Sequence, residues 1–461
     1  MVELTHVELP AFGVELDFPE MPLCVYEARL ETAAQRLRRE GLDCLVIYGD
    51  REHAANLAYL TGFDPRFEEA LLLLSADGRK RLIVGNECMG YLPDPRLGCE
   101  VVLFQELSLM GQPRGESRPL RAIFADFGIG PGSSVGCVGW KFFEGGLVEG
   151  GAAACDLPSY IVDVLRSLAG DPARVRNATA LFMHPSDGLR VVNEPEQIAQ
   201  FEFAAIRTSE GVKSALAHLR EGVAERELEP WFDGAGLPLS CHRMVGFGEK
   251  ARRGLASPSG NRARLGDPFT LGFGVVGALT CRAGCVARGP QDLPAADGDF
   301  YSRLAASYFD VVAAWYESIR LGATGGEVYR AVEARRDARL FRFAVNPGHY
   351  LHLDEWVHSP FAPESRVGLR SGMVLQMDII PVSQGPFYCI NAEDGLAIAD
   401  RELCGQIAGR YPACWERIEA RRQFMREALG IRLHESVLPL SNTSGWLPPF
   451  ALSLDRALAR R

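Results

Sequence analysis

The apolar positions of residues 27–40 recur every three or four residues, which is the spacing of an amphipathic helix. The repeating positions are Leu30, Ala33, Ala34 and Leu37. Gly41 follows as a predicted C-cap, because glycine readily adopts the left-handed conformation that ends a helix. Residues 43–48 are then continuously apolar after their first position, a pattern typical of a short strand buried on both faces.

A second helix is predicted at residues 52–60, followed by two apolar strands at residues 70–74 and 81–84. The sequence Ala-Asp-Gly at residues 76–78 lies between these strands and indicates a hairpin turn. Further helix and strand signals continue to about residue 180. The first part of the chain is therefore predicted to be an α/β domain.

A stretch rich in turn formers, His184–Gly188, marks the predicted end of this domain. We therefore expect an N-terminal domain at residues 1–188 and a second domain at residues 189–461. Asn193 precedes a helical pattern, and Glu196 stands three residues after it, so the two residues predict a capping box at the start of a helix.

The second domain alternates helical and strand patterns. One long helix is predicted at residues 301–319, and a shorter one after Thr324–Gly326. The tail beyond Arg432 is apolar but broken by prolines, which interrupt both helices and central strands. We expect this tail to lie extended against the domain, or against a second subunit, rather than to form an element of its own.

Length and charge narrow the class of protein. A chain of 461 residues is too long for one hydrophobic core, which agrees with two domains. The formal charge of -10 argues against nucleic acid or an anionic membrane as the main partner, because both bind basic surfaces. The sequence shows no signal-peptide pattern and no membrane-length apolar run, and its twelve scattered cysteines fit a reducing compartment. The expected location is the cytoplasm.

Four short motifs follow one another in the second domain. They are Arg264–Asp267 (Arg-Leu-Gly-Asp), Asn346–His349 (Asn-Pro-Gly-His), Gly372–Asp378 (Gly-Met-Val-Leu-Gln-Met-Asp) and Ala392–Gly395 (Ala-Glu-Asp-Gly). In this order they resemble the catalytic domain of the creatinase/aminopeptidase P/prolidase family, and residues 26–90, notably Asn56–Phe63, resemble its N-terminal domain. The resemblance implies an α/β chain with an N-terminal creatinase-type αβα domain and a C-terminal α+β pita-bread domain. It also implies a homodimer in which each N-terminal domain reaches toward the partner's pocket.

Metal-dependent members of this family hold a pair of divalent ions with two aspartates, a histidine and two glutamates. Carried over residue by residue, these ligands fall on Gly272, Ala283, His349, Asp378 and Glu393. Glycine and alanine offer no ligating side chain, and adjacent ions need carboxylates to bridge them. Asp267 and Asp394 are expected on turns or on the opposite strand face. The resemblance therefore implies the fold without its dinuclear centre, and we expect no cofactor.

Creatinase itself is a metal-free branch of the family that uses a histidine as acid and base on a C–N bond. Its sequence pattern resembles Gly254–Pro258 before Asn261–Arg262, but the histidine position holds Ala256. The creatinase mechanism therefore does not transfer directly, and another group must move the proton.

Three histidines, His349, His352 and His358, lie within ten residues, and an imidazole can shuttle protons near neutral pH. His349 is the first catalytic candidate, with a structural role as the alternative, and the odd spacing sends His349 and His352 to opposite faces of a straight strand. By the resemblance, Asp378 and Glu393 face a common cleft from neighbouring strands. They act either as acid and base or as a pair that orients a cationic nitrogen.

The predicted substrate-binding residues are His352, His358 and Phe273. Phe273 belongs to an apolar set that suits a small, partly apolar substrate and that also contains Leu271, Val275 and Leu279. Cys281 and Cys285 are four residues apart on a predicted strand and share one face. Packing is the favoured interpretation for both cysteines, because reactivity requires a lowered thiol pKa.

These residues favour a creatinase-like, metal-independent hydrolase or lyase that acts on a C–N bond of a small, amino-acid-derived substrate. His349 would shuttle the proton, while Asp378 and Glu393 would orient the substrate nitrogen. Two alternatives stay open. One is a non-catalytic binding protein of the same fold, and the other is an Xaa-Pro aminopeptidase-type hydrolase with one metal ion on His349, Asp378 and Glu393.

Overall fold

The computed structural model describes the whole chain except residue 387 and divides it into two compact units. One unit comprises residues 21–191, and the other comprises residues 1–20 together with residues 192–461. The division falls close to the boundary predicted between residues 188 and 189.

The first twenty residues differ from the prediction, which placed them in the N-terminal domain. Strand β1 (Val2–His6) pairs antiparallel with β17 (Arg456–Arg460) from the far end of the sequence. This pairing supplies the backbone hydrogen bonds that two short strands need. The start of the chain therefore belongs to the C-terminal unit.

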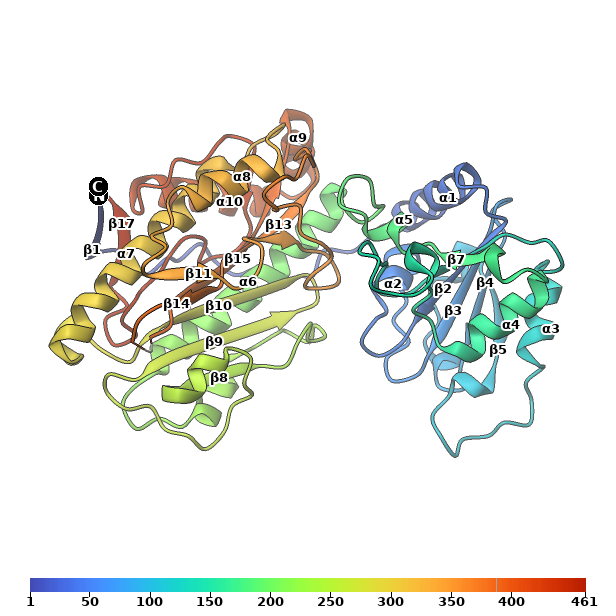
Figure 1. The fold of residues 1–461 in the computed structure, drawn as a ribbon, viewed down its shortest axis with the longest axis horizontal. Helices are drawn as coiled ribbons and strands as arrows, with labels where there is room; N and C mark the ends of the chain where they lie inside the picture. The colour runs from blue at the N-terminus through green and yellow to red at the C-terminus, as the bar shows by residue number, and fades with distance from the viewer. Residues whose placement is uncertain (387) are drawn as a thin grey trace. The chain divides into compact units, whose positions relative to one another are not determined.

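The N-terminal unit is built on a six-stranded sheet with helices packed around it (Figure 1). In spatial order its strands are β5 (Glu100–Leu103), β4 (Lys80–Val84), β3 (Ala70–Ser75), β2 (Cys44–Gly49), β6 (Val135–Val138) and β7 (Val175–Asn177). Its helices are α1 (Leu23–Arg39), α2 (Ala55–Thr61), α3 (Leu120–Phe127), α4 (Ser159–Ala169) and α5 (Ala180–Met183). Strands β2 and β3 are buried along their whole length, and β3 and β4 form the predicted antiparallel hairpin.

The C-terminal unit is built on a seven-stranded antiparallel sheet (Figure 1). Its strands run in the order β12 (His349–Tyr350), β13 (Val374–Asp378), β15 (Asn391–Ile398), β10 (Ala278–Cys285), β9 (Pro268–Val275) and β8 (Met244–Phe247), and β16 (Val437–Pro439) also pairs with β15. Its helices are α6 (Pro195–His218), α7 (Ala295–Ser318), α8 (Gly325–Glu333), α9 (Arg401–Arg410) and α10 (Pro412–Glu427). Strands β11 (Phe341–Phe343) and β14 (Pro381–Ser383) form a separate pair. This arrangement confirms the predicted fold class.

Helix α6 covers one face of this sheet, which we call the rear face (Figure 1). Helix α6 packs closely on the sheet because a glycine in a turn of the sheet stands opposite a large side chain of the helix. A Cβ on Gly277, in the turn between β9 and β10, would lie 2.8 Å from Phe201 of the helix. Thr208 of the helix also hydrogen-bonds Thr280 of β10 at 2.9 Å. The opposite face, the front face, is therefore the one left for a site.

The start of α6 differs from the predicted capping box. Glu194 is the N-cap and Pro195 is the first helical residue. Asn193 instead donates its side-chain amide to the carbonyl oxygen of Gly372 at 3.0 Å. Proline lacks the N–H that a first helical residue leaves unpaired, so this helix can begin without a side-chain cap.

The C-terminal tail lies against its own unit, as predicted, but it differs from the prediction in forming elements of its own. It contributes β16 and β17, which add to β15 and β1. Pro439 is the last residue of β16, and Pro448 and Pro449 lie between the two strands. Sheet edges offer unpaired backbone groups for a short strand to bind. The tail is therefore part of the core of its unit.

No helix in the described part of the chain is both long enough and apolar enough to cross a membrane. The homodimer and the cytoplasmic location stay predictions.

Candidate active site

One row of directly paired residues crosses the front face of the sheet. From β8 to β13 the row contains Met244, Gly272, Cys281, Glu393 and Asp378. Directly opposed residues of antiparallel strands point to the same side of a sheet. Asp378 and Glu393 are therefore side by side on neighbouring strands.

His349 approaches this row from β12, at the edge of the sheet. Its Nε2 lies 3.9 Å from Oδ2 of Asp378 and 4.0 Å from Oε1 of Glu393. One ligating atom from each of the three residues lies within 4.8 Å of the others, and all three residues are buried. The fold thus brings together the three residues that the sequence predicted as catalytic.

The hydrogen bonds of His349 determine which ring nitrogen faces the carboxylates. Nδ1 lies 3.1 Å from the carbonyl oxygen of Tyr350. A carbonyl oxygen can only accept, so Nδ1 carries a hydrogen and donates a hydrogen bond to it. In the neutral ring Nε2 then presents a lone pair to Asp378, to Glu393 and to Glu355, whose Oε1 is 3.1 Å away. Nε2 and its three carboxylate neighbours are all acceptors, so a proton or another cation is needed between them.

Glu355 and Trp356 also belong to the site, although neither residue was predicted there. They lie on a hairpin in which the Tyr350 N–H donates to the carbonyl oxygen of His358 at 2.7 Å. The indole of Trp356 stacks on the imidazole of His349, with ring centroids 4.1 Å apart and planes inclined by 23°. The sequence shows only that an acidic and an aromatic residue lie between His352 and His358. The bend of the hairpin is what places these two side chains against His349.

Two side chains donate hydrogen bonds to the carboxylate of Glu393. Gln376 is fully buried, and its amide donates to Oε1 of Glu393 at 3.2 Å and to the carbonyl oxygen of Leu279 at 2.6 Å. The thiol of Cys281, directly opposite on β10, is the second donor. These bonds position the carboxylate without adding a positive charge.

Burial and mutual repulsion raise the pKa values of the carboxyl groups. For Asp378, burial and the charge of Glu355 raise the pKa to about 6, against a lowering by His349. For Glu393, burial and the charges of Asp378 and Glu355 raise the pKa well above its usual value. Burial lowers the pKa of His349, but the charges of Glu355 and Asp378 outweigh burial, so the pKa is raised overall. The centre therefore favours a bound proton or another cation.

The ligands that two metal ions need are not present in the row. A Cβ on Gly272 would lie 2.5 Å from Cε of Met244 and 3.0 Å from Sγ of Cys281. These two side chains therefore fill the space that a carboxylate at position 272 would need.

The strand register places Cys281, and not Ala283, opposite Gly272 in the row. The turn between β9 and β10 contains only residues 276–277, so the residue opposite Gly272 is Cys281. Ala283 lies opposite Asn391, one step beyond the row. Burial and the neighbouring carboxylates raise the pKa of the Cys281 thiol well above its usual value, so it is a neutral donor rather than a thiolate ligand. The residues present do not fit a dinuclear centre.

The prediction that Phe273 binds substrate is also corrected. Side chains alternate along a strand, so Phe273 points to the rear face if Gly272 points to the front. Its ring packs against Phe232, with centroids 5.3 Å apart, and lies beside Gly211 of α6. The residues that share its face are Leu271 and Val275, whereas Leu279 lies on the front face.

The other two clustered histidines take different surroundings from His349. His352 is fully buried, and its ring meets Phe201 of α6 edge-on at 5.3 Å. His358 donates Nδ1–H to the carbonyl oxygen of Ser359 at 3.1 Å. His349 is thus the member of the cluster that the fold directs at the carboxylates.

The creatinase-like segment makes structural contacts. Asn261 donates to Oε1 of the buried Glu225 and to the carbonyl oxygen of Phe247, both at 3.1 Å. The carbonyl oxygen of Ala256 accepts from the N–H of Val245 at 3.1 Å. These bonds hold the segment against β8, and Ala256 supplies no acid or base.

Comparisons with known proteins agree with this architecture. The Creatinase/Prolidase N-terminal domain family matches residues 29–110. A prolidase from Thermococcus sibiricus is 17% identical with a TM-score of 0.64, over 83% of this chain and 96% of that one. A prolidase from Pyrococcus horikoshii is 14% identical with a TM-score of 0.61, over 81% of this chain and 95% of that one. An X-Pro aminopeptidase from Thermotoga maritima is 15% identical with a TM-score of 0.58, over 81% of this chain and 95% of that one. No curated protein matches the chain.

Proposed function

Since the chain contains a creatinase/prolidase N-terminal domain and has the pita-bread fold of prolidases, we propose that it hydrolyses a C–N bond of a small, amino-acid-derived substrate without a dinuclear metal centre. The observation that carries this proposal is the cluster of His349, Asp378 and Glu393, whose ligating atoms lie within 4.8 Å of one another in a buried position. In the metal-independent form, the cation at this cluster is the nitrogen of the substrate.

The spacing of the cluster suits such a cation. A protonated nitrogen about 2.8 Å from two acceptors, at a tetrahedral angle, holds them about 4.6 Å apart. A metal ion about 2.1 Å from each would hold them about 3.4 Å apart. The distances from Nε2 of His349 to Asp378 and Glu393 are 3.9 Å and 4.0 Å, between the two cases. A cationic nitrogen can therefore be bound with small side-chain shifts.

Hydrolysis needs a group that takes a proton from water and a group that protonates the departing nitrogen. His349 can do both, because Tyr350 fixes Nδ1–H and leaves Nε2 for the exchange. The hydroxyl of water joins the carbon, and the proton carried by Nε2 joins the departing nitrogen, which is neutral in the C–N bond and becomes the cation beside Asp378 and Glu393 when the bond breaks. Asp378, whose raised pKa of about 6 lies near neutrality, can hold a proton during the same cycle. Trp356 covers the imidazole and limits the entry of bulk water.

The proposal is tested with metal-stripped protein and a panel of amides, ureas and N-substituted amino acids. We expect turnover of one class, and we expect His349→Ala to lower kcat about 100- to 10,000-fold, the usual contribution of a positioned acid–base group. His242→Ala is the matched control, since His242 is exposed, lies 2.6 Å from the carbonyl oxygen of Leu255 and is not one of the three clustered residues. Turnover that His349→Ala retains in full would contradict the proposed role.

A second candidate function is a hydrolase with one metal ion. It is favoured by the same three residues, because one histidine and two carboxylates form a suitable open ligand set. His349, Asp378 and Glu393 would hold the ion, which would supply Lewis-acid chemistry. Activity that is lost on chelation and restored by one equivalent of metal would favour this candidate. A bound metabolite recovered intact after long incubation, with no turnover of the panel, would instead indicate a binding protein.

A further inference from the structure

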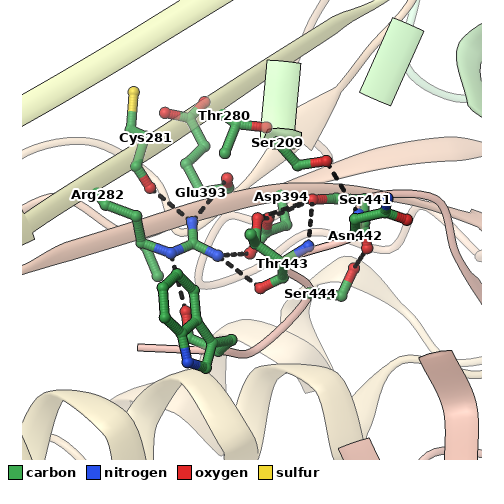
Figure 2. A network of polar contacts seen from close by, with 12 residues as sticks. Ser209, Thr280, Cys281, Arg282, Glu393, Asp394, Ser441, Asn442, Thr443 and Ser444 are labelled. Atoms are coloured by element: carbon green, nitrogen blue, oxygen red, sulfur yellow. Dashed lines mark hydrogen bonds and ion pairs between the residues drawn. The ribbon is translucent and has the colours of Figure 1, made fainter. Parts of the chain in front are cut away.

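A buried ion pair lies on the rear face, directly behind the front-face row (Figure 2). It joins Arg282 of β10 to Asp394 of β15, with Nη2 2.8 Å from Oδ2 and both side chains fully buried. Each residue follows a member of the row in the sequence, because Arg282 comes after Cys281 and Asp394 comes after Glu393. The proposed reaction makes no use of this pair.

The pair is held by the C-terminal segment Ser441–Trp446, which lies between β16 and β17. Arg282 donates Nε–H to the carbonyl oxygen of Trp446 at 2.8 Å and Nη2–H to that of Thr443 at 2.5 Å. Oδ1 of Asp394 accepts from the hydroxyls of Ser441 at 2.6 Å and Thr443 at 2.8 Å (Figure 2). A buried pair is stabilising only when its remaining donors and acceptors are satisfied, and this segment satisfies them.

The remaining guanidinium nitrogen of Arg282 binds the backbone of two row residues. Nη1 donates to the carbonyl oxygen of Cys281 at 2.6 Å and lies 3.3 Å from the carbonyl oxygen of Glu393 (Figure 2). One rigid, planar group therefore joins β10 to β15 at the point where Cys281 and Glu393 stand opposite each other. The side chains of both residues meet on the front face, where the thiol donates to the carboxylate.

We propose that Arg282 is a positioning residue: held by Asp394 and the C-terminal segment, it fixes the backbone under Glu393 and Cys281 and so sets where the Glu393 carboxylate stands in the active site. The catalytic groups themselves lie on the front face, and Arg282 acts through the two carbonyl oxygens. This role does not depend on which C–N substrate or which cation the site binds.

Arg282→Lys keeps the positive charge but removes the planar fork that reaches four carbonyl oxygens and a carboxylate. Arg421→Lys is the matched control. Arg421 is equally buried, ion-pairs with Glu202 at 2.7 Å and binds Asn442 of the same C-terminal segment, but its recorded hydrogen bonds do not include the row.

The readout is the alkylation rate of each cysteine by iodoacetamide at pH 8, followed by mass spectrometry of the folded protein. In the wild type, the Cys281 thiol donates a hydrogen bond to the Glu393 carboxylate directly opposite it. If the carboxylate moves, that hydrogen bond is lost and the thiol is free to react. We expect Arg282→Lys to raise the alkylation rate at Cys281 by about tenfold, the factor that one ordinary hydrogen bond is worth, and Arg421→Lys to leave it within about twofold.

Cys285, on the same strand and fully buried, reports general loosening of the sheet. If Arg282→Lys raises the alkylation rates of Cys281 and Cys285 equally, or if Arg421→Lys raises the rate of Cys281 as much as Arg282→Lys does, Arg282 has only a stabilising role. Either result would overturn the proposal. An unchanged Cys281 rate in Arg282→Lys would also overturn it. The alkylation test needs no substrate, so its failure can be told apart from a failure of the proposed function. Once a substrate is known, Arg282→Lys is expected to lower kcat by a larger factor than it raises KM.

Discussion

Glu393 and Asp394 are neighbours in the sequence and both are buried, but they face opposite sides of β15 and have opposite surroundings. Asp394 accepts from Arg282, Ser441 and Thr443, so its charge is fully compensated. Within the described part of the chain, Glu393 accepts from the neutral donors Gln376 and Cys281 and stands beside another carboxylate, and burial raises its pKa. Buried charge with complete partners is the mark of a structural group, whereas an uncompensated cluster indicates a binding or catalytic centre.

The rear face of the sheet therefore has a structural role, and the front face holds the candidate site. The rear face stabilises the sheet through α6 and the Arg282–Asp394 pair. The front face brings Asp378 and Glu393 together beside His349, and burial and mutual repulsion raise the pKa values of both carboxyl groups. Such local cost at a site is expected when a protein retains stability elsewhere.

The largest effect is expected from breaking the rear pair. Asp394→Ala leaves the guanidinium of Arg282 buried without its carboxylate, which should lower the free energy of unfolding by about 3–5 kcal/mol. Urea denaturation at pH 7 measures the change. Glu393→Gln is the comparison on the front face and should lose no stability, so equal losses in the two variants would break the proposed division.

A change of opposite sign is expected at Asp378. Burial raises its pKa from 3.8 to about 6, so in the folded protein its charged form is disfavoured. Stability from this group is present below about pH 4 and is lost as the pH rises through about 6. Asp378→Asn avoids that loss, so at pH 7 it should be more stable than wild type by about 1–3 kcal/mol.

Unfolding of Asp378→Asn and wild type is compared between pH 4 and pH 8. The difference should vanish toward pH 4. A difference that is constant with pH would show that the Asp378 carboxyl group is not held in a disfavoured charged form.

A smaller loss is expected at Gly272, where the front row is already filled. Gly272→Ala places a methyl group against Met244 and Cys281, and the flexible end of Met244 can yield, so the cost should be about 1 kcal/mol. In a Met244→Ala background, Gly272→Ala should cost much less stability than it does in the wild type. Thermal unfolding of the two single variants and the double variant measures this coupling. Additive effects would contradict the packing described for the row.

The smallest effect on stability is expected from Glu355→Gln, because this side chain is about a quarter exposed and bonds only His349 among its recorded ion pairs. Unfolding free energy should change by about 0.5 kcal/mol or less. The pKa of His349 should nevertheless fall, since the charge of Glu355 raises it. Histidine NMR titration, with His349→Gln to assign the signal, measures this, and an unchanged His349 pKa would remove Glu355 from the site.

The predictable part of the site came from ordered motifs. His349, Asp378 and Glu393 could be named because each stands in a motif whose order resembles a known fold, and the β13–β15 register then places the two acids together. Phe273 was misjudged, although strand alternation beside Gly272 already sends it to the other face. Glu355 could not be selected, because no local pattern shows that a hairpin returns it to His349.

The sequence by itself determined the α/β elements of the first unit, the long helices and the loss of two carboxylates from the metal-binding pattern, because apolar spacing and residue identity are local properties. Only the tertiary structure decided that Cys281 rather than Ala283 stands opposite Gly272, that the tail supplies the partners of Arg282, and that Glu355 faces His349. These facts depend on turn length, on pairing between distant strands and on the face each strand presents. A one-residue difference in register reverses the face, and that information lies in the pairing of strands rather than in either strand alone.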